Sequence, residues 1–175
     1  MTQNVIRAEP LDPRSFLPFG DVLAARGAPD RLINRGRCER FHDLARLDFG
    51  PDGQAGISLF RSEGTSLPLR LEMLERHPEG SQAFIPMQQA PFLVIVADDE
   101  NGCPGRPRAF IAAPGQGVNI LRGIWHGVLT PLGKAALFAV IDRIGRTPNL
   151  QEHWLEVPYI VEIQKQTTRN AGQQA

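Results

Sequence analysis

The chain contains few cysteines and no long apolar run. It has two cysteines in 175 residues, Cys38 and Cys103, with no CxxC pair, so neither a disulfide framework nor a thiolate zinc site is expected. The longest apolar stretch, residues 90–97, is far too short to span a bilayer. Residues 1–20 mix charged with apolar side chains and lack the apolar core of a secretory signal. These features predict a soluble cytoplasmic protein that does not bind membranes.

Neither sign of charge is in excess. Lys and Arg together number 19, as do Asp and Glu, so the formal net charge is +0. A protein that neutralises many phosphates normally shows a basic excess or a basic face, and we therefore expect no nucleic-acid partner. The basic residues are 17 Arg and 2 Lys. Arginine grips carboxylates through paired hydrogen bonds, which would suit an acidic small-molecule substrate, although genome composition explains the bias equally well.

Glycine and proline punctuate the chain at short intervals. The 17 Gly and 15 Pro separate short apolar runs, as expected for many strands joined by turns. Asp12 followed by Pro13 predicts one short helix, and no long helical pattern is present. The sequence thus predicts an all-β sandwich or closed barrel of mainly antiparallel strands, forming a single domain over residues 1–163, with a polar, disordered tail over 164–175. We predict strands at 5–8, 37–42, 56–61, 67–77, 82–86, 92–97, 108–112, 118–125, 135–142 and 159–163.

The strand predicted over residues 67–77 has an apolar face. Its odd positions from Leu67 to Met73 are apolar, and continued alternation carries Glu75 and His77 to the same inner side. A carboxylate and an imidazole placed there must be paired or bound to a ligand. In the alternative interpretation the strand ends at Met73 and the following residues form a solvated turn.

Two of the four histidines have a setting that suggests chemistry. His77 stands in the pattern Glu75-x-His77-x4-Gln82, which can send polar groups from neighbouring strands into one cavity. His126 follows a glycine-rich segment and could shape the mouth of a pocket. The chain has no GxSxG nucleophile elbow, no phosphate-binding P-loop and no GxGxxG after a strand, so serine hydrolases, NTPases and Rossmann oxidoreductases are disfavoured.

Several blocks resemble one enzyme family, the ureidoglycolate lyases, formerly called ureidoglycolate hydrolases. The most specific block is ERHPEGSQAFIPM over residues 75–87. The resemblance covers residues 4–163 and implies a cupin-like β-barrel, usually a homodimer, that splits ureidoglycolate into glyoxylate and urea in allantoin and purine catabolism. Further matching blocks are INxG at 33–36, ERFHDLA at 39–45, RAFI at 108–111, QGVN at 116–119, WH at 125–126 and IDR at 141–143.

The resemblance also implies roles for particular residues. Glu75-x-His77-x4-Gln82 looks like a degenerate cupin metal motif, and nickel is associated with some members, so a divalent ion held by His77, His126 and Gln82 is a candidate cofactor; no organic cofactor is expected.

For the reaction itself, His77 or His126 is the expected base, and Glu75 orients or tunes its neighbour. Gln82 and Asn119 are expected to bind the ureido group. Arg40 is the first choice for the substrate carboxylate and Arg122 the second, with His42 beside Arg40; a surface ion pair is the structural alternative for Arg40. Asp142 and Arg143 are expected to form an ion pair in the barrel wall.

Two other functions remain open at this point. A cupin-like barrel can be a small-molecule sensor that binds without turnover, because fold alone does not decide function. An amidohydrolase acting on the same substrate would release ammonia and carbon dioxide with glyoxylate. Product analysis separates these possibilities.

Overall fold

The structure, a computed structural model, describes residues 4–163 and consists mainly of strands. In this part of the chain the only helix is α1 (Pro13–Phe16), and the Asp12 side chain caps it by accepting hydrogen bonds from the backbone N–H groups of Arg14 and Ser15. That helix is far too short to cross a membrane, and no described helix qualifies. The predicted tail, 164–175, lies outside the described residues. The strands are β1 (Asn4–Pro10), β2 (Gly20–Leu23), β3 (Arg31–Ile33), β4 (Cys38–Arg40), β5 (Gln54–Ser62), β6 (Leu69–Arg76), β7 (Gln82–Pro86), β8 (Phe92–Ala97), β9 (Asp99–Glu100), β10 (Cys103–Pro104), β11 (Arg108–Ala112), β12 (Gly117–Ile120), β13 (Trp125–His126), β14 (Thr130–Pro131), β15 (Ala136–Ile144) and β16 (Gln151–Ile163).

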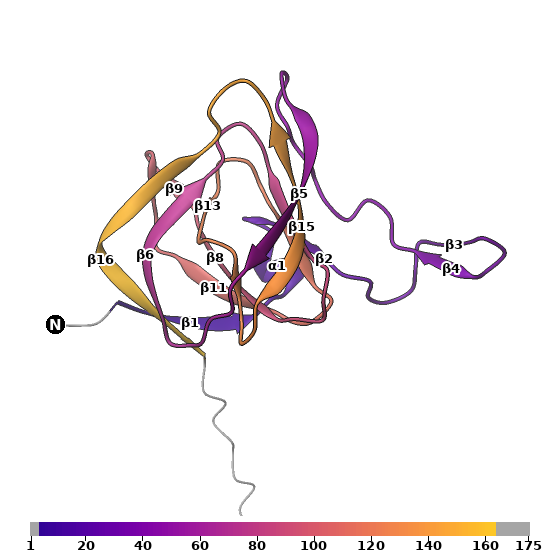
Figure 1. Ribbon diagram of the computed structural model, residues 1–175, viewed down its shortest axis with the longest axis horizontal. Coiled ribbons are helices and arrows are strands. Elements are labelled where there is room, and N and C mark those ends of the chain that lie inside the picture. The colour runs from indigo at the N-terminus through magenta and orange to yellow at the C-terminus, as the bar shows by residue number, and fades with distance from the viewer. Residues whose placement is uncertain (1–3, 164–175) are drawn as a thin grey trace, which may run out of the picture.

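Six strands close into a ring. They follow the order β11, β1, β16, β6, β13 and β8, and β8 pairs back to β11 (Figure 1). Only β1 runs parallel to its two neighbours in this ring, and the other ring pairings are antiparallel. The expected all-β barrel of mainly antiparallel strands is therefore confirmed.

A second sheet packs on the outside of β8 and β11. Its order is β2, β12, β7, β15 and β5. Alternation along β8 separates two cores, because Leu93, Ile95 and Ala97 fill the ring while Phe92, Val94 and Val96 face the second sheet. From the second sheet, Phe84, Val118, Phe138 and Val140 complete that outer core.

Strand β6 does not keep one inward face. Leu71 and Leu74 both lie in the core of the ring, although their numbers differ in parity. Glu75 pairs with His126, which pairs with Val96, so Glu75 faces the space between the ring and the second sheet. The pairing of β6 with β16 shifts register between Trp154 and Tyr159, and this irregularity breaks the alternation. The single inward row predicted from Leu67 to His77 is wrong, whereas the inward placement of Glu75 is correct.

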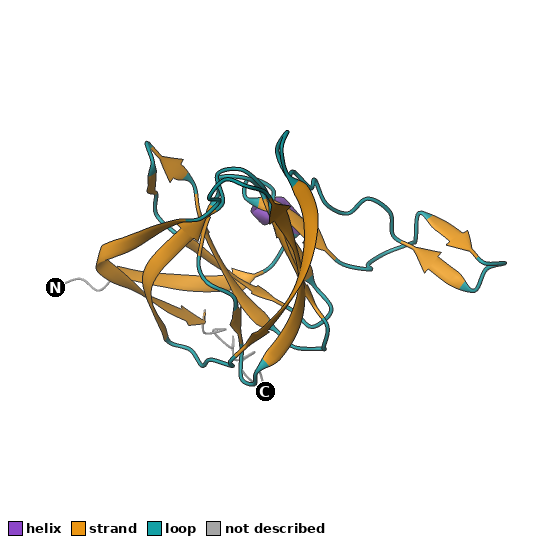
Figure 2. Cartoon of the chain, turned by 45° about the horizontal axis from the view of Figure 1, so that its top comes forward, coloured by secondary structure: helices purple, strands orange, loops and turns teal. Residues whose placement is uncertain are grey.

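Two further predictions about the strands need correction. Residues 118–125 form two strands, β12 and β13, because the chain turns between them at Gly123, which has a φ of 78°. The strand predicted at 37–42 is shortened to β4, which pairs with β3 in a hairpin that stands away from the barrel (Figures 1 and 2).

Candidate active site

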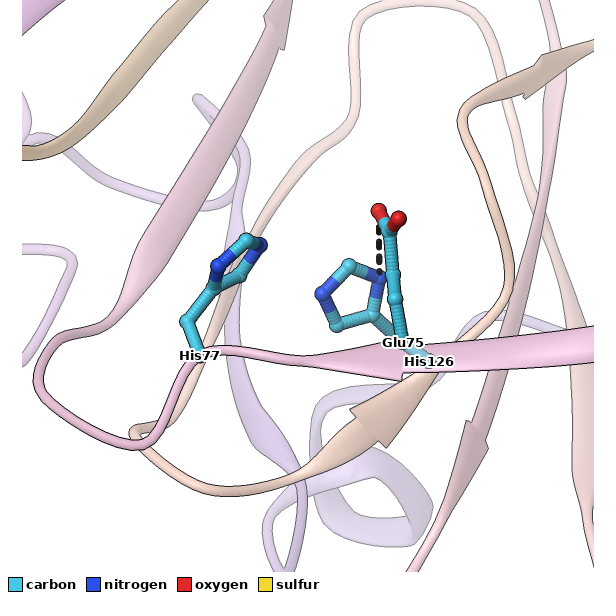
Figure 3. A group of neighbouring side chains, drawn as sticks. All are labelled: Glu75, His77 and His126. Carbon is cyan, nitrogen blue, oxygen red and sulfur yellow. Dashed lines mark ion pairs between the residues drawn. The ribbon is translucent and has the colours of Figure 1, made fainter. Parts of the chain in front are cut away.

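Glu75, His77 and His126 form a close group between the ring and the second sheet. One ligand atom from each lies within 4.8 Å of the others. Glu75 is placed by β6 directly opposite His126 on β13, and His77 follows the end of β6. The backbone N–H of Gly123 donates to the His77 carbonyl oxygen over 2.9 Å, which ties the turn before β13 to β6. In Figure 3 the two imidazoles extend toward the same space, with Glu75 beside His126.

The two imidazoles present the same nitrogen for binding. Nδ1 of His77 lies 2.6 Å from the carbonyl oxygen of Asn149, and Nδ1 of His126 lies 3.1 Å from that of Gly127. A carbonyl oxygen can only accept, so each Nδ1 carries the hydrogen and each Nε2 keeps its lone pair. Both Nε2 atoms are buried and have no hydrogen-bond partner among the described residues. Because unpaired buried polar atoms are costly, two adjacent ones indicate a ligand site.

Burial controls the charges in this group. It lowers the pKa of His126 to about 4, and a protonated His77 would act in the same direction. The His126 ring is therefore neutral near pH 7, and its 3.8 Å approach to Glu75 is not an ion pair there. Burial also raises the pKa of Glu75, and a protonated His77 would oppose this shift.

Gln82 brings a fourth polar group to the same region. Its Nε2 lies 3.4 Å from Oδ2 of Asp142, whereas its Oε1 is buried without a hydrogen-bond partner in the described part of the chain. Gln82 and Glu75 line one cavity of about 410 Å³, a size that suits a small organic acid. The other lining residues are Phe60, Arg61, Ser62, Phe84, Val128 and Leu129.

The donor set fits a divalent metal ion. Two neutral imidazole nitrogens and a carboxylate are ligands that nickel, zinc and iron accept. The hydrogen bonds from each Nδ1 orient the rings as they do in protein metal sites. The close group consists of Glu75, His77 and His126, so Glu75 is a candidate ligand beside the two expected histidines, and the expected role of Gln82 as a ligand stays a prediction.

Arg40 and His42 are not brought to this cavity within one chain. Arg40 ends β4, His42 follows two residues later, and both are exposed on the protruding hairpin segment. Their side chains contact each other, with 2.9 Å between Arg40 Nη2 and His42 Nδ1.

Asn119 also lies outside the cavity. It stands on β12 between Val118 and Ile120, which face the outer core, so its side chain points to the opposite face of the sheet. There its amide group donates to Asp21 Oδ2 over 3.0 Å and to the Arg46 carbonyl oxygen over 3.1 Å. The structure therefore gives Asn119 a supporting position, and the expected contact with a ureido group is not available to it.

Arg122 and the residues at 142–143 occupy different surroundings from those expected. Arg122 donates from Nε to the Pro78 carbonyl oxygen over 2.7 Å and lines a separate cavity of about 820 Å³. Arg143 pairs with Glu79 at 3.1 Å, so the expected Asp142–Arg143 ion pair does not form. Adjacent residues of β15 point to opposite faces, and Asp142 continues the inward row of Phe138 and Val140. That alternation could have placed Asp142 on the inner face of β15 from the sequence alone.

Comparison with known proteins identifies the family. The family model described as "Ureidoglycolate lyase" matches residues 3–162. The ureidoglycolate lyase of Rhodobacter capsulatus is 59% identical over 154 residues, covering 88% of this chain and 96% of the relative. "Ureidoglycolate lyase 2" of Rhizobium meliloti is 53% identical over 154 residues, covering 87% and 94%, and the Chelativorans enzyme is 50% identical over 159 residues, covering 90% and 96%. Among solved structures, RmlC from Streptococcus suis aligns over 78% of this chain and 56% of its own with a TM-score of 0.39 and 14% identity. The chain belongs to the ureidoglycolate lyase family.

Proposed function

We propose that this chain is a ureidoglycolate lyase, which cleaves the C–N bond of (S)-ureidoglycolate to give glyoxylate and urea in allantoin degradation, part of purine catabolism. The observation that carries the proposal is the group of buried, unpartnered acceptors, His77 Nε2, His126 Nε2 and Gln82 Oε1, in a member of this family. The reaction needs a base and polar contacts but no covalent nucleophile. We place it in the cytoplasm, as the sequence predicts.

The proton moves from the substrate hydroxyl to the leaving nitrogen. We assign the first step to Nε2 of His77, since its Nδ1 is engaged with Asn149 and its Nε2 has a free lone pair. As the hydroxyl oxygen becomes the aldehyde oxygen of glyoxylate, the C–N bonding pair leaves with the ureido nitrogen. The imidazolium of His77 then returns the proton to that nitrogen, which completes urea. Glyoxylate and urea together contain every atom of the substrate.

The other polar groups orient the substrate. Oε1 of Gln82 accepts from the ureido N–H groups, and Asp142 holds the Gln82 amide by accepting from its Nε2. His126, with its pKa lowered to about 4, is a weak base and serves as a neutral acceptor. Burial raises the pKa of Glu75 and so makes its carboxylate a stronger proton acceptor than an exposed one. Glu75 is therefore the second candidate base.

A bound metal would occupy the same three side chains. We propose nickel, held by Glu75, His77 and His126, because these donors suit a late divalent transition metal. When bound, the ion supplies Lewis acidity that lowers the pKa of the substrate hydroxyl. His77 would then be a ligand and the proton would pass to another base, so metal content decides between the two roles of His77.

We further propose that the protein is a homodimer that packs through the outer face of β5, β15 and β7. Pairing aligns Leu59, Ala139 and Ile85 in one row, and Ile57, Ile141 and Ala83 in the next, all on the face away from the outer core. Ala83 is buried, and the other five residues are partly or largely exposed. A contiguous exposed apolar face of this kind marks a protein interface. Its most exposed members are Ile57 (77%), Leu59 (62%), Met87 (55%) and Ile85 (38%).

Product analysis tests the proposed reaction. Purified protein incubated with (S)-ureidoglycolate should release glyoxylate and urea in equal amounts, without ammonia. Ammonia in place of urea would identify an amidohydrolase. Saturable binding without any product would identify a sensor.

A further inference from the structure

The segment that carries β3 and β4 stands clear of the barrel. Residues 24–43, called the arm below, include no buried residue. β3 and β4 pair only with each other, and the hydrogen bonds that the structure gives the arm all join two of its own residues. Figures 1 and 2 show the hairpin extending from the side of the second sheet that lies away from the ring.

The arm holds its shape through local contacts. The N–H of Gly36, which has a φ of 81°, donates to the Ile33 carbonyl oxygen over 3.1 Å, and the N–H of His42 donates to Asp30 Oδ2 over 2.8 Å. A two-stranded hairpin with neither face covered is only marginally stable in water. A hairpin of this kind gains stability when a surface of another molecule covers it.

The side chains that line the candidate cavity supply little positive charge. Of the described residues that line it, the charged ones are Glu75 and Arg61, and Arg61 is exposed. The substrate of the proposed reaction is a carboxylate, which needs a cation when it leaves water. The hairpin over residues 31–40 carries four arginines and one glutamate.

We propose that the arm of one chain reaches the cavity of a second copy, where Arg40, with His42 beside it, binds the substrate carboxylate. This inference rests on the proposed function and the proposed dimer face. The arm leaves the second sheet at β2, one edge of the sheet, and the cavity opens beside β5, the other edge. A two-fold axis parallel to the strands brings the β2 edge of one copy to the β5 edge of the other.

The surface beside the cavity suits this arm. A groove of about 370 Å³ shares Ser62, Val128 and Leu129 with the cavity, and it also carries Glu63 and Glu72. These two carboxylates, with Arg70 between them in sequence, give the groove a net negative charge opposite in sign to that of the hairpin. Exposed apolar side chains border the groove at Val128 (53%) and Trp154 (67%).

A pair of arm variants tests whether Arg40 binds the substrate. Arg40→Ala should raise KM roughly 10- to 100-fold, because a charged hydrogen-bonding partner of the carboxylate is lost, with a smaller change in kcat. Arg37→Ala removes an equally exposed arginine from the same hairpin and should leave both constants unchanged.

Subunit complementation tests whether Arg40 acts in the second copy. Arg40→Ala and His126→Ala chains, coexpressed with different tags and isolated as heterodimers, should regain about half of the wild-type rate at substrate far below KM, because one of two sites is then intact. The matched control heterodimer combines His126→Ala with Glu75→Gln. Both changes lie in the barrel, so every site has one defect and the rate should stay at that of the single variants.

Three results would overturn the inference. A heterodimer of Arg40→Ala and His126→Ala that is no faster than its parents, with active wild type, shows that Arg40 does not act across subunits and leaves the proposed reaction intact. A rise in KM from Arg61→Ala but not from Arg40→Ala places the carboxylate contact within one chain. Inactive wild-type protein removes the proposed function and this inference together.

Discussion

His77 and His126 differ in what they can do, although both offer Nε2 to the same space. The pKa of His126 is lowered to about 4 by burial, so this ring acts as an uncharged acceptor over the physiological range. His77 is only half buried, and its Nδ1 is fixed by Asn149. Glu75 gives the pair a carboxylate whose pKa is raised by burial. Proton transfer and metal binding therefore depend on the same three side chains.

Replacement of His77 by Asn distinguishes the role of Nδ1 from the role of Nε2. In His77→Asn the side-chain amide can still donate to the Asn149 carbonyl oxygen, as Nδ1 does, but the group in the position of Nε2 is lost. Turnover of ureidoglycolate should fall by about 10²- to 10⁴-fold, with little change in Tm. Steady-state kinetics and thermal unfolding measure the two effects. Near-normal turnover would remove His77 from the proposed mechanism.

Metal titration distinguishes the two possible ligand sets. Protein stripped with a chelator should gain thermal stability when Ni²⁺ is added, because the ion binds the folded state. Glu75→Gln should weaken Ni²⁺ binding in calorimetry by more than about tenfold, and Gln82→Leu should weaken it much less. The opposite order of effects would favour the set that includes Gln82.

At the scale of elements, Asp21 joins the segment that follows the arm to the second sheet. It lies on β2, and its carboxylate accepts from the backbone N–H of Arg46 over 2.9 Å and from Nε of Arg46 over 2.8 Å. Burial would raise the pKa of Asp21, but these hydrogen bonds and one from Asn119 together hold it below its ordinary value. The carboxylate thus fixes the point at which the chain returns from the arm to the barrel.

Replacement of Asp21 should make the free energy of unfolding depend less on pH. Asp21→Asn should reduce the free energy of unfolding at pH 7 by about 1.5–3 kcal/mol, since hydrogen bonds to a charged acceptor are lost. Because the folded-state pKa is depressed, this stabilisation is present above the unfolded pKa and is lost as pH falls through the folded value. The two proteins should therefore begin to converge below about pH 4 and meet only below the folded-state pKa. Urea unfolding across this pH range measures the difference. Asp52→Asn, at an exposed loop position, is the control, and a difference from wild type that persists at low pH would contradict the assignment.

Strands bounded by glycine and proline were predictable, and those that depend on distant pairing were not. The ranges 82–86, 92–97 and 108–112 form with the predicted bounds because each is a short apolar run between turn residues. The reversal of faces along β6 depends on a register shift in β16, about 80 residues away, and no local pattern reports it. Two-residue strands such as β9 and β14 carry no periodicity.

In the candidate active site, too, the residues that are close in sequence were predictable, and those placed by distant pairing were not. Spacing brought Glu75, His77 and Gln82 together, since they lie on adjacent stretches of one chain segment. Asn119 was expected in the cavity, but Val118 and Ile120 on either side of it face the outer core, so its side chain points to the opposite face of the sheet. Arg40 was also expected in the cavity, but the path of the arm is set by tertiary structure, which the sequence pattern does not report.

For the whole molecule, the arrangement of surfaces explains how one small barrel can form a complete site. The ring and the second sheet enclose the imidazoles, the outer face of the second sheet is apolar, and the arm extends on that side (Figure 1). Dimerisation through this face would bury apolar side chains and bring a cationic arm toward an acidic groove. In such a dimer, the activity of each site depends on the arm of the partner chain, so dissociation should lower the activity.

A charged residue on this face should dissociate the dimer. Leu59→Glu places a carboxylate within the proposed interface, where it would be buried without a partner. Sedimentation velocity should show a folded monomer for Leu59→Glu and a dimer for wild type, and activity should fall with the loss of the arm's partner. Leu150→Glu, at an exposed site outside the face, is the control. A dimer that survives Leu59→Glu would place the interface elsewhere.

The most direct test of the proposed reaction is to measure urea, ammonia and glyoxylate released from ureidoglycolate by the wild-type protein and by His77→Asn under the same conditions. Urea and glyoxylate should appear together from the wild type, without ammonia, and both should nearly vanish with the variant. Ammonia from the wild type, or equal urea release by both proteins, would contradict the account.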